Sequence, residues 1–221
     1  MSQLNTHRSK AEWPDPCRRG FRGNRRLQSL SAIVSDYAKH HGQKAKKELR
    51  YLRKIRTFED AVTQAGLALR PDESKKRSSH QRRIPRAVLE QATRRLRRVK
   101  LKSAASFEDL IKRVRMATKV VDGIGELYVY DTSLRLGAWL RLLPRKVYLH
   151  AGTRLGAKAL HLDHRAKSLA PKELPSKLQR LRPYELEDVL CIYKDWLGKA
   201  KGVGQRNRRK TAIRSSGKVV C

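Results

Sequence analysis

The sequence predicts an all-α protein, built as one compact helical domain with basic tails at both ends. Three observations lead to this fold class. Val, Ile and Thr do not gather in alternating runs, and no Asn-Gly hairpin signal is present. Hydroxyl residues followed by acidic residues mark helix starts at Thr57 and Ser106. Of the 221 residues, 39% are hydrophobic, which is enough apolar material for one core.

The first two helices are predicted within residues 57–100, and the second of them is strongly basic. Thr57 caps a helix that runs to about Leu69 and carries acidic residues in its first turn. Residues 86–100 follow a proline and form an amphipathic helix. Its apolar residues recur at a spacing near 3.6 and are Ala87, Val88, Ala92, Leu96 and Val99. Arginines occupy most of the other positions, so we expect this helix to present a basic outer face.

A pair of helices joined by a glycine turn is predicted next, over residues 107–142. The second helix of the pair covers about 126–142. Gly123 and Gly125 permit positive φ and let a ligand approach the backbone closely, while Ile124 between them points into the core. The unpaired amides that open the second helix suit a phosphate oxygen.

The remaining elements complete a helical domain. A short segment over 147–152 leads into a helix over 153–160, and a last helix covers about 183–197. The inward-facing residues of the last helix are Leu186, Val189, Leu190, Tyr193 and Leu197, with Cys191 as a small buried residue. We therefore expect a helical domain over 50–197, a basic and largely flexible region over 1–49, and a basic tail over 198–221.

The charge indicates the class of partner. Lys and Arg number 53 against 20 Asp and Glu, a formal net charge of +33. Residues 75–102 contain twelve Lys or Arg and one acid, Glu90. Such a field repels itself unless a polyanion neutralises it, so nucleic acid is the expected partner and a small-metabolite enzyme is disfavoured.

Other classes are also disfavoured by the composition. No apolar run approaches the roughly 20 residues that a membrane span needs, so no membrane partner is expected. The three cysteines lie far apart and form no zinc or iron–sulfur spacing, so we expect no metal and no cofactor. A reducing intracellular location, cytoplasmic or associated with the nucleoid, fits this composition.

The turn Val121-Asp122-Gly123-Ile124-Gly125 resembles the helix-hairpin-helix motif, whose hairpin runs hydrophobic-x-Gly-hydrophobic-Gly. The order that follows, a helix, a short connection at 143–146, the segment 147–152 and a further helix, is similar to the DNA glycosylase superfamily that contains this motif. The whole chain also looks like an uncharacterised bacterial family. The resemblance implies an all-α fold and contact with the DNA backbone at Gly123, Ile124 and Gly125.

The chain departs from that superfamily at its catalytic positions. Glu126, Leu127 and Tyr128 occupy the place of the lysine that forms a Schiff base in bifunctional members, and His150 stands near the position of the catalytic aspartate. The four-cysteine cluster of some members is absent from the sequence. The resemblance therefore implies backbone binding rather than base excision.

The candidate site residues fall into two groups. The expected nucleic-acid contacts are Gly123, Ile124, Gly125, Arg154, Lys75, Lys76, Arg77, Arg82, Arg83, Arg86, Arg94, Arg95, Arg97 and Arg98. Arg154 either meets a phosphate or carries surface charge. Asp131 either pairs with Arg135 one helical turn away or is a satisfied buried cap, or else it acts as a functional carboxylate. His150 either caps a helix in the core or acts as a general base.

Three functions remain open at this level. The first is non-sequence-specific DNA binding through phosphates, since no base-reading cluster is apparent. The second is a structural RNA-binding subunit of a ribonucleoprotein. The third is a divergent DNA glycosylase or lyase, which requires a pocket with a carboxylate between the hairpin and residues 147–154. Packing of that space by Tyr128, Tyr130 and Trp139 would count against the enzyme.

Overall fold

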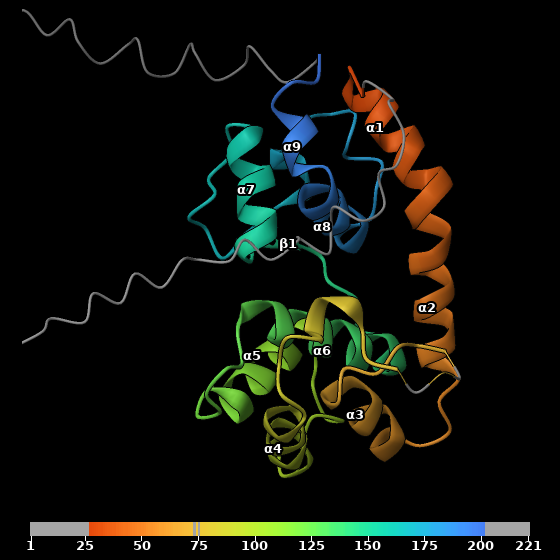
Figure 1. The fold of residues 1–221 in the computed structure, drawn as a ribbon, viewed down its shortest axis with the longest axis vertical. Helices are drawn as coiled ribbons and strands as arrows, with labels where there is room; N and C mark the ends of the chain where they lie inside the picture. The colour runs from red at the N-terminus through yellow and green to blue at the C-terminus, as the bar shows by residue number, and fades with distance from the viewer. Residues whose placement is uncertain (1–26, 73, 75, 202–221) are drawn as a thin grey trace, which may run out of the picture.

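The computed structural model describes residues 27–72, 74 and 76–201, most of which are helical (Figure 1). The helices are α1 (Leu30–Tyr37), the π-helix η2 (Ala38–Gly42), α2 (Gln43–Arg53), α3 (Phe58–Gly66), the 3-10 helix η3 (Ser79–Gln81), α4 (Arg86–Arg97), α5 (Phe107–Thr118), α6 (Glu126–Leu140), α7 (Ala151–Ala159), the 3-10 helix η4 (Pro171–Glu173), α8 (Pro183–Ile192) and α9 (Lys194–Leu197). Two short strands, β1 (Val147–Tyr148) and β2 (Ser168–Leu169), pair antiparallel. The all-α prediction is confirmed.

Local capping signals set the helix starts where the sequence predicts them. The Oγ1 atom of Thr57 accepts a hydrogen bond from the Asp60 amide at 3.1 Å, and Ser106 Oγ accepts one from the Asp109 amide at 3.1 Å. These side chains satisfy amides that have no partner within the first helical turn. Helix α4 begins directly after Pro85 and has buried Leu89, Ala92, Thr93 and Leu96 along its inner face.

The prediction of a largely flexible region over 1–49 is wrong for the part of it that the structure describes. Residues 30–53 form one continuous helical path, α1, η2 and α2, that runs along one side of the molecule (Figure 1). Leu30, Ile33, Val34 and Tyr37 lie at helical spacing and are buried. The many basic residues mask this apolar pattern in the composition. Residues 1–26 lie outside the described residues.

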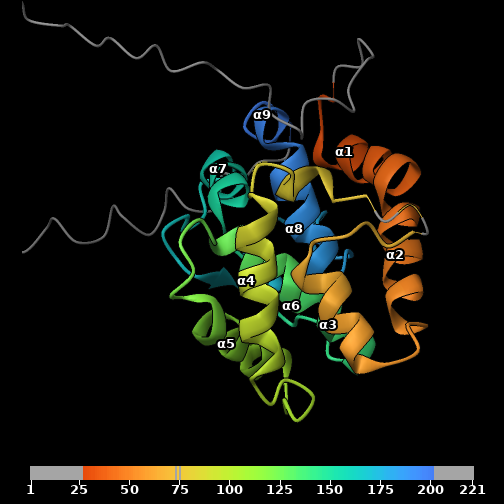
Figure 2. The ribbon, with the colours of Figure 1, turned by 60° about the horizontal axis from the view of Figure 1, so that its bottom comes forward.

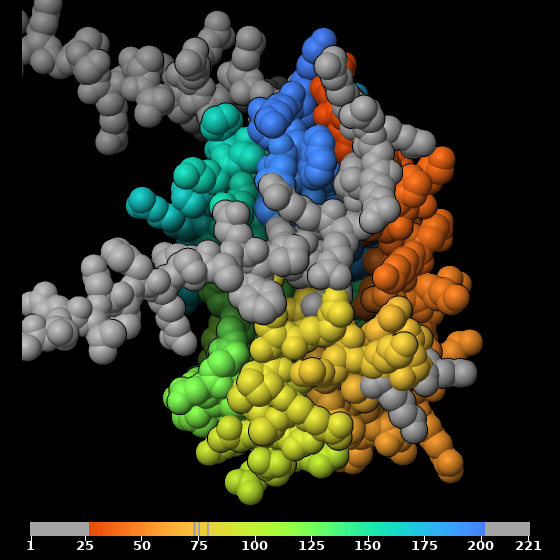
Figure 3. Space-filling model, viewed as in Figure 1, coloured from red at the N-terminus to blue at the C-terminus, as the bar shows by residue number. Residues whose placement is uncertain are grey.

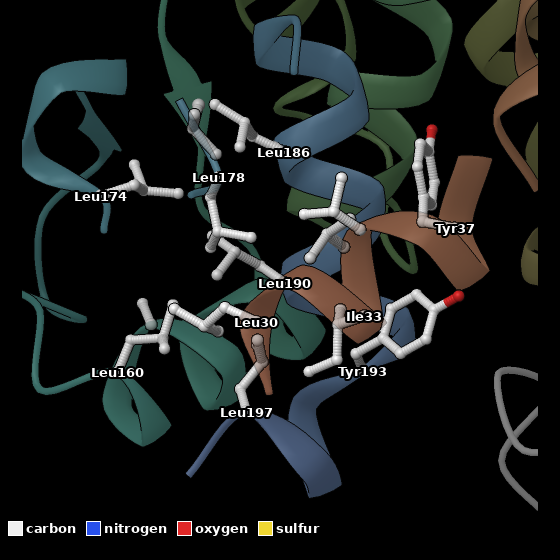
Figure 4. Packing of buried hydrophobic residues seen from close by; sticks show 14 of the residues in the cluster. Leu30, Ile33, Tyr37, Leu160, Leu174, Leu178, Leu186, Leu190, Tyr193 and Leu197 are labelled. Carbon is white, nitrogen blue, oxygen red and sulfur yellow. The ribbon is translucent and has the colours of Figure 1, made fainter. Parts of the chain in front are cut away.

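The helical path is anchored in a core around α8. Figure 4 shows Leu30, Ile33 and Tyr37 of α1 beside Leu186 and Leu190 of α8. The last helix predicted from sequence is confirmed as α8 followed by α9, and its predicted inward-facing residues are almost completely buried. Its small residue Cys191 is buried as well.

The end of the helical domain lies beyond the predicted boundary at residue 197. Ala200 is buried against the α8 core, and the Lys201 amide donates to the Gln28 carbonyl at 2.7 Å. The two ends of the described chain are therefore fastened together. Residues 202–221, most of the predicted basic tail, lie outside the described residues.

A second core lies under α3, α4, α5 and α6, which Figure 2 shows from below. The α5–α6 pair is joined at the predicted glycines, and Gly123 has a φ of 84°. Gly125 has a φ of −105°, so the expectation of positive φ there is wrong. Gly125 instead stands in an extended conformation as the residue before α6, which any residue type can adopt.

In the part of the chain that the structure describes, no helix has both the length and the apolar composition that crossing a membrane requires.

Candidate functional site

A basic surface covers the outer side of α4. Arg94, Arg95 and Arg98 are exposed and make no ion pair among the described residues. Two further arginines are already compensated: Arg86 Nε lies 2.8 Å from a carboxylate oxygen of Glu90, and Arg97 Nε lies 3.8 Å from one of Glu59. The uncompensated positive charge of α4 therefore gathers near its C-terminal end. Figure 3 shows α4 and the loop before it on the lower front of the molecule.

The glycine turn packs directly against α4. Val88 and the half-buried Ile124 contact one small core that also holds the buried Val121 and Tyr128. A β-carbon at Gly123 would meet Val88 Cγ1 at 3.7 Å. The predicted position of Ile124, pointing into the core, is confirmed. The exposed turn therefore lies against the first turn of the basic helix, although more than twenty residues of sequence separate Val88 from Val121.

Arg154 does not lie on this surface as a free cation, and its assignment as a phosphate contact is not supported by its geometry. Its guanidinium donates to both carboxylate oxygens of Glu126, at 3.1 and 3.2 Å. It also donates to the carbonyls of His164, Ala166 and Leu149, at 3.0, 2.8 and 3.3 Å. Since both terminal nitrogens of its guanidinium are already hydrogen-bonded, Arg154 fastens α7 to the start of α6.

The basic loop before α4 borders a large cavity of about 760 Å³ between the two cores. Lys76, Arg77 and Arg82 of the predicted interface line it, whereas Arg83 is exposed elsewhere and Lys75 lies outside the described residues. Arg77 Nη1 also donates to the Ile84 carbonyl at 2.7 Å, which holds the loop in place. Other nitrogen-bearing side chains around the cavity are His41, Lys44, Arg70, His80 and Arg135.

Carboxyl groups from two distant helices meet in the same cavity. Asp131 of α6 accepts a hydrogen bond from Gln81 Nε2 at 2.8 Å. It does not pair with Arg135, which donates to the Leu69 carbonyl at 2.9 Å instead. Glu187 and Asp188 approach from α8, and Tyr37 donates to Asp188 at 2.7 Å. The cavity therefore combines a cationic border with hydrogen-bond acceptors inside.

His150 is the residue before α7 and is buried at 2% exposure. Its backbone amide donates to Thr153 Oγ1 at 2.7 Å, and its Nε2 atom is hydrogen-bonded to Glu187. His150 is thus a buried residue at a helix start, as one of its two sequence interpretations expects. The imidazole also borders the large cavity, where the general-base interpretation would place it.

Burial changes the protonation chemistry of this cluster. Removal from water raises the pKa of Glu187 well above its ordinary value, and the nearby Asp131 charge raises it further. Burial also raises the pKa of Asp188, with the Glu187 charge adding to the shift and the hydrogen bond from Tyr37 opposing it. Within the described residues, the Tyr130 hydroxyl is the one buried side-chain polar atom without a hydrogen-bond partner. Such groups are rare in folded proteins.

A second, smaller cavity of about 160 Å³ lies between the start of α6 and β1. Glu126, Tyr130 and His150 line it, so a cavity with a carboxylate exists where the glycosylase hypothesis requires one. Tyr128 and Trp139 do not line it. Their polar atoms donate to the Gly66 carbonyl at 2.8 Å and to the Ile55 carbonyl at 2.9 Å, respectively.

Sequence reasoning missed Glu187 and Asp188. Two adjacent acids inside an otherwise apolar helix were the available signal, but the apolar spacing of 183–197 was sufficient to predict a helix without them. No group of three His, Cys, Asp or Glu side chains converges as metal ligands would in residues 27–72, 74 and 76–201.

Comparison of the chain with protein-family models, with curated proteins and with solved structures found no match.

Proposed function

We propose that this protein binds nucleic acid through backbone phosphates, with duplex DNA as the preferred ligand. The observation that carries the proposal is the cluster of Arg94, Arg95 and Arg98, three exposed cations without acidic partners at the C-terminal end of α4, the helix whose first turn contacts the glycine turn. The start of α6 adds amides that have no intrahelical acceptor and carry the positive end of the helix dipole. Lys76 and Arg82 extend the cationic surface toward the large cavity.

The α5–α6 pair acts in this proposal as a helix-hairpin-helix motif. Gly123 supplies the positive φ of the turn, and Gly125 leaves open space, since no atom lies within 4 Å of a β-carbon placed there. A phosphate can therefore approach the backbone closely. Binding of this kind is non-sequence-specific because phosphate contacts carry no direct base information. An intracellular location at the nucleoid fits such a protein.

The test is binding of the purified protein to matched duplex DNA, single-stranded DNA and structured RNA across about 50–400 mM salt. About eight phosphate contacts give a log–log salt slope near −7 on duplex DNA. Preference for duplex that survives removal of residues 1–26 and 202–221 supports the proposal. Preference for structured RNA, or loss of binding with those segments, supports the alternative of a ribonucleoprotein subunit.

The two cavities favour a second candidate, a divergent DNA glycosylase or lyase. A carboxyl group with a raised pKa, such as Glu187, can protonate a departing base, while a carboxylate such as Asp131 can activate water. Both groups border a cavity of nucleotide size beside the basic loop.

The enzyme is tested by incubating the protein with duplexes that contain uracil, an oxidised base or an abasic site, and by measuring strand scission or base release. Activity that disappears in Asp131→Asn and Glu187→Gln, with duplex affinity retained, supports this candidate. Absence of product from all three duplexes under conditions of full binding refutes it for these substrates.

A further inference from the structure

A second cationic site lies on α2, a helix to which the predicted interface assigns no residue. Gln43, Lys46, Arg50 and Arg53 recur at intervals of three or four residues and share one face of the helix. Together with Arg182, from the segment before α8, they line an open groove of about 300 Å³. In Figure 3 the side chains of α2 follow the right edge of the molecule.

The floor of the groove is apolar and packed between helices. Leu49 and Tyr184 line the groove, and both are buried in a small core between α2, α6 and α8. The two walls are therefore fixed relative to each other by apolar packing. Lys46, Arg50, Arg53 and Arg182 are exposed and line one open groove, so an anion bound in the groove would relieve their mutual repulsion.

Acidic side chains compensate only part of this charge. Glu185 lies 3.6 Å from Lys46 Nζ, and its other oxygen accepts the Arg182 backbone amide at 2.9 Å. Among the described residues, Arg50, Arg53 and the Arg182 guanidinium make no ion pair with a carboxylate. Three arginines facing one groove match the forked hydrogen-bonding pattern that phosphate oxygens accept.

The groove is separate from the α4 surface. Helix α3 packs against α4 and α6, and α2 packs on α6, so α3 and α6 lie between the two basic surfaces. Figures 1 and 2 show α2 and α4 as distinct helices with α3 between them. A ligand held at one surface does not fill the other.

We propose that the α2 groove is a second phosphate site for nucleic acid, so that one molecule holds two duplex segments. This inference rests on the proposed function, because it takes the phosphate to be part of a nucleic acid. The α4 surface binds one segment, and Arg50, Arg53 and Arg182 bind the backbone of the other.

The experiment measures bridging. One duplex is fixed to beads, a second duplex carries a fluorophore, and the protein is added at about 100 mM salt. The groove variant is Arg50→Gln/Arg53→Gln/Arg182→Gln, with Arg50→Gln/Arg53→Gln as a milder form. The matched control is Lys39→Gln/Lys47→Gln/Lys54→Gln, which removes the same charge from exposed positions outside the groove. Circular dichroism checks that each variant folds.

We expect the groove variant to capture at least 10-fold less of the second duplex than the control, while its affinity for a single duplex stays within about 3-fold of the control. Equal capture by the two variants overturns the second site. A wild-type protein that binds no single duplex overturns the proposed function itself and nucleic acid as the ligand of the groove. If the wild-type protein binds no duplex, titration with inorganic pyrophosphate distinguishes two cases: binding that requires the intact groove shows a phosphate site whose ligand is not nucleic acid, and no binding shows that the groove is not a phosphate site.

Discussion

Removing the uncompensated charge of α4 tests the proposed interface most directly. In Arg94→Gln/Arg95→Gln/Arg98→Gln, three cations that have no acidic partner become neutral, while the buried face of the helix is unchanged. Each phosphate contact contributes about 0.9 to the log–log salt slope, so the slope on duplex DNA should flatten by about 2.7. At about 0.1 M salt, the same three contacts correspond to roughly a 500-fold loss of affinity.

Fluorescence anisotropy with a labelled duplex, repeated at several salt concentrations, measures both quantities. Lys39→Gln/Lys47→Gln/Lys54→Gln is the matched control, because it removes three charges from exposed positions away from α4. We expect the control slope to change by less than about 1. Equal changes of slope in the two variants would refute a specific role for α4, since general net charge would then account for binding.

Three further outcomes are expected. Gly156→Ala should destabilise the fold by about 2 kcal/mol or more, measured by urea unfolding. The new methyl group would overlap the Leu190 carbonyl oxygen and lie 2.7 Å from the Leu190 carbonyl carbon. A change below about 0.5 kcal/mol would contradict the close packing of α7 on α8. Burial raises the pKa of Glu187 from its ordinary value of 4.5, so its contribution to stability is complete below pH 4.5 and is lost as the pH rises through the pKa of the folded state. Glu187→Gln should therefore flatten the fall in unfolding free energy between pH 5 and 8, and an unchanged slope would count against a buried neutral carboxyl. Gly125→Val should fold, since the φ of −105° at this position and the open space around it accept a side chain. The variant should bind duplex DNA more weakly in the same anisotropy assay. Wild-type affinity of the variant would show that the glycine turn is not part of the interface.

The helices could be predicted from sequence wherever their signals are local. Thr57 and Ser106 cap their helices through atoms only three residues away, so a short window contains the whole interaction. The exposed arginines of α4 follow from one helical period and one preceding proline. Position 125 shows the limit of such rules, because two glycines were present and only Gly123 takes a positive φ.

The N-terminal helical path was missed because composition outweighed periodicity. Basic residues dominate α2, and the π-helix at 38–42 adds a residue to one turn, which shifts the apolar register between α1 and α2. Tertiary packing on α8 stabilises a segment whose charge would favour an extended chain in isolation.

The sequence by itself determined the helical class, the excess of positive charge and the positions of the basic helix and the glycine turn along the chain. Only the tertiary structure decided that Asp131, His150 and Glu187 border one cavity and that Arg154 is occupied by Glu126 and backbone carbonyls. The reason is the range of the interactions. Tyr37 and Asp188 are 151 residues apart along the chain and 2.7 Å apart in space, and no local pattern encodes that contact.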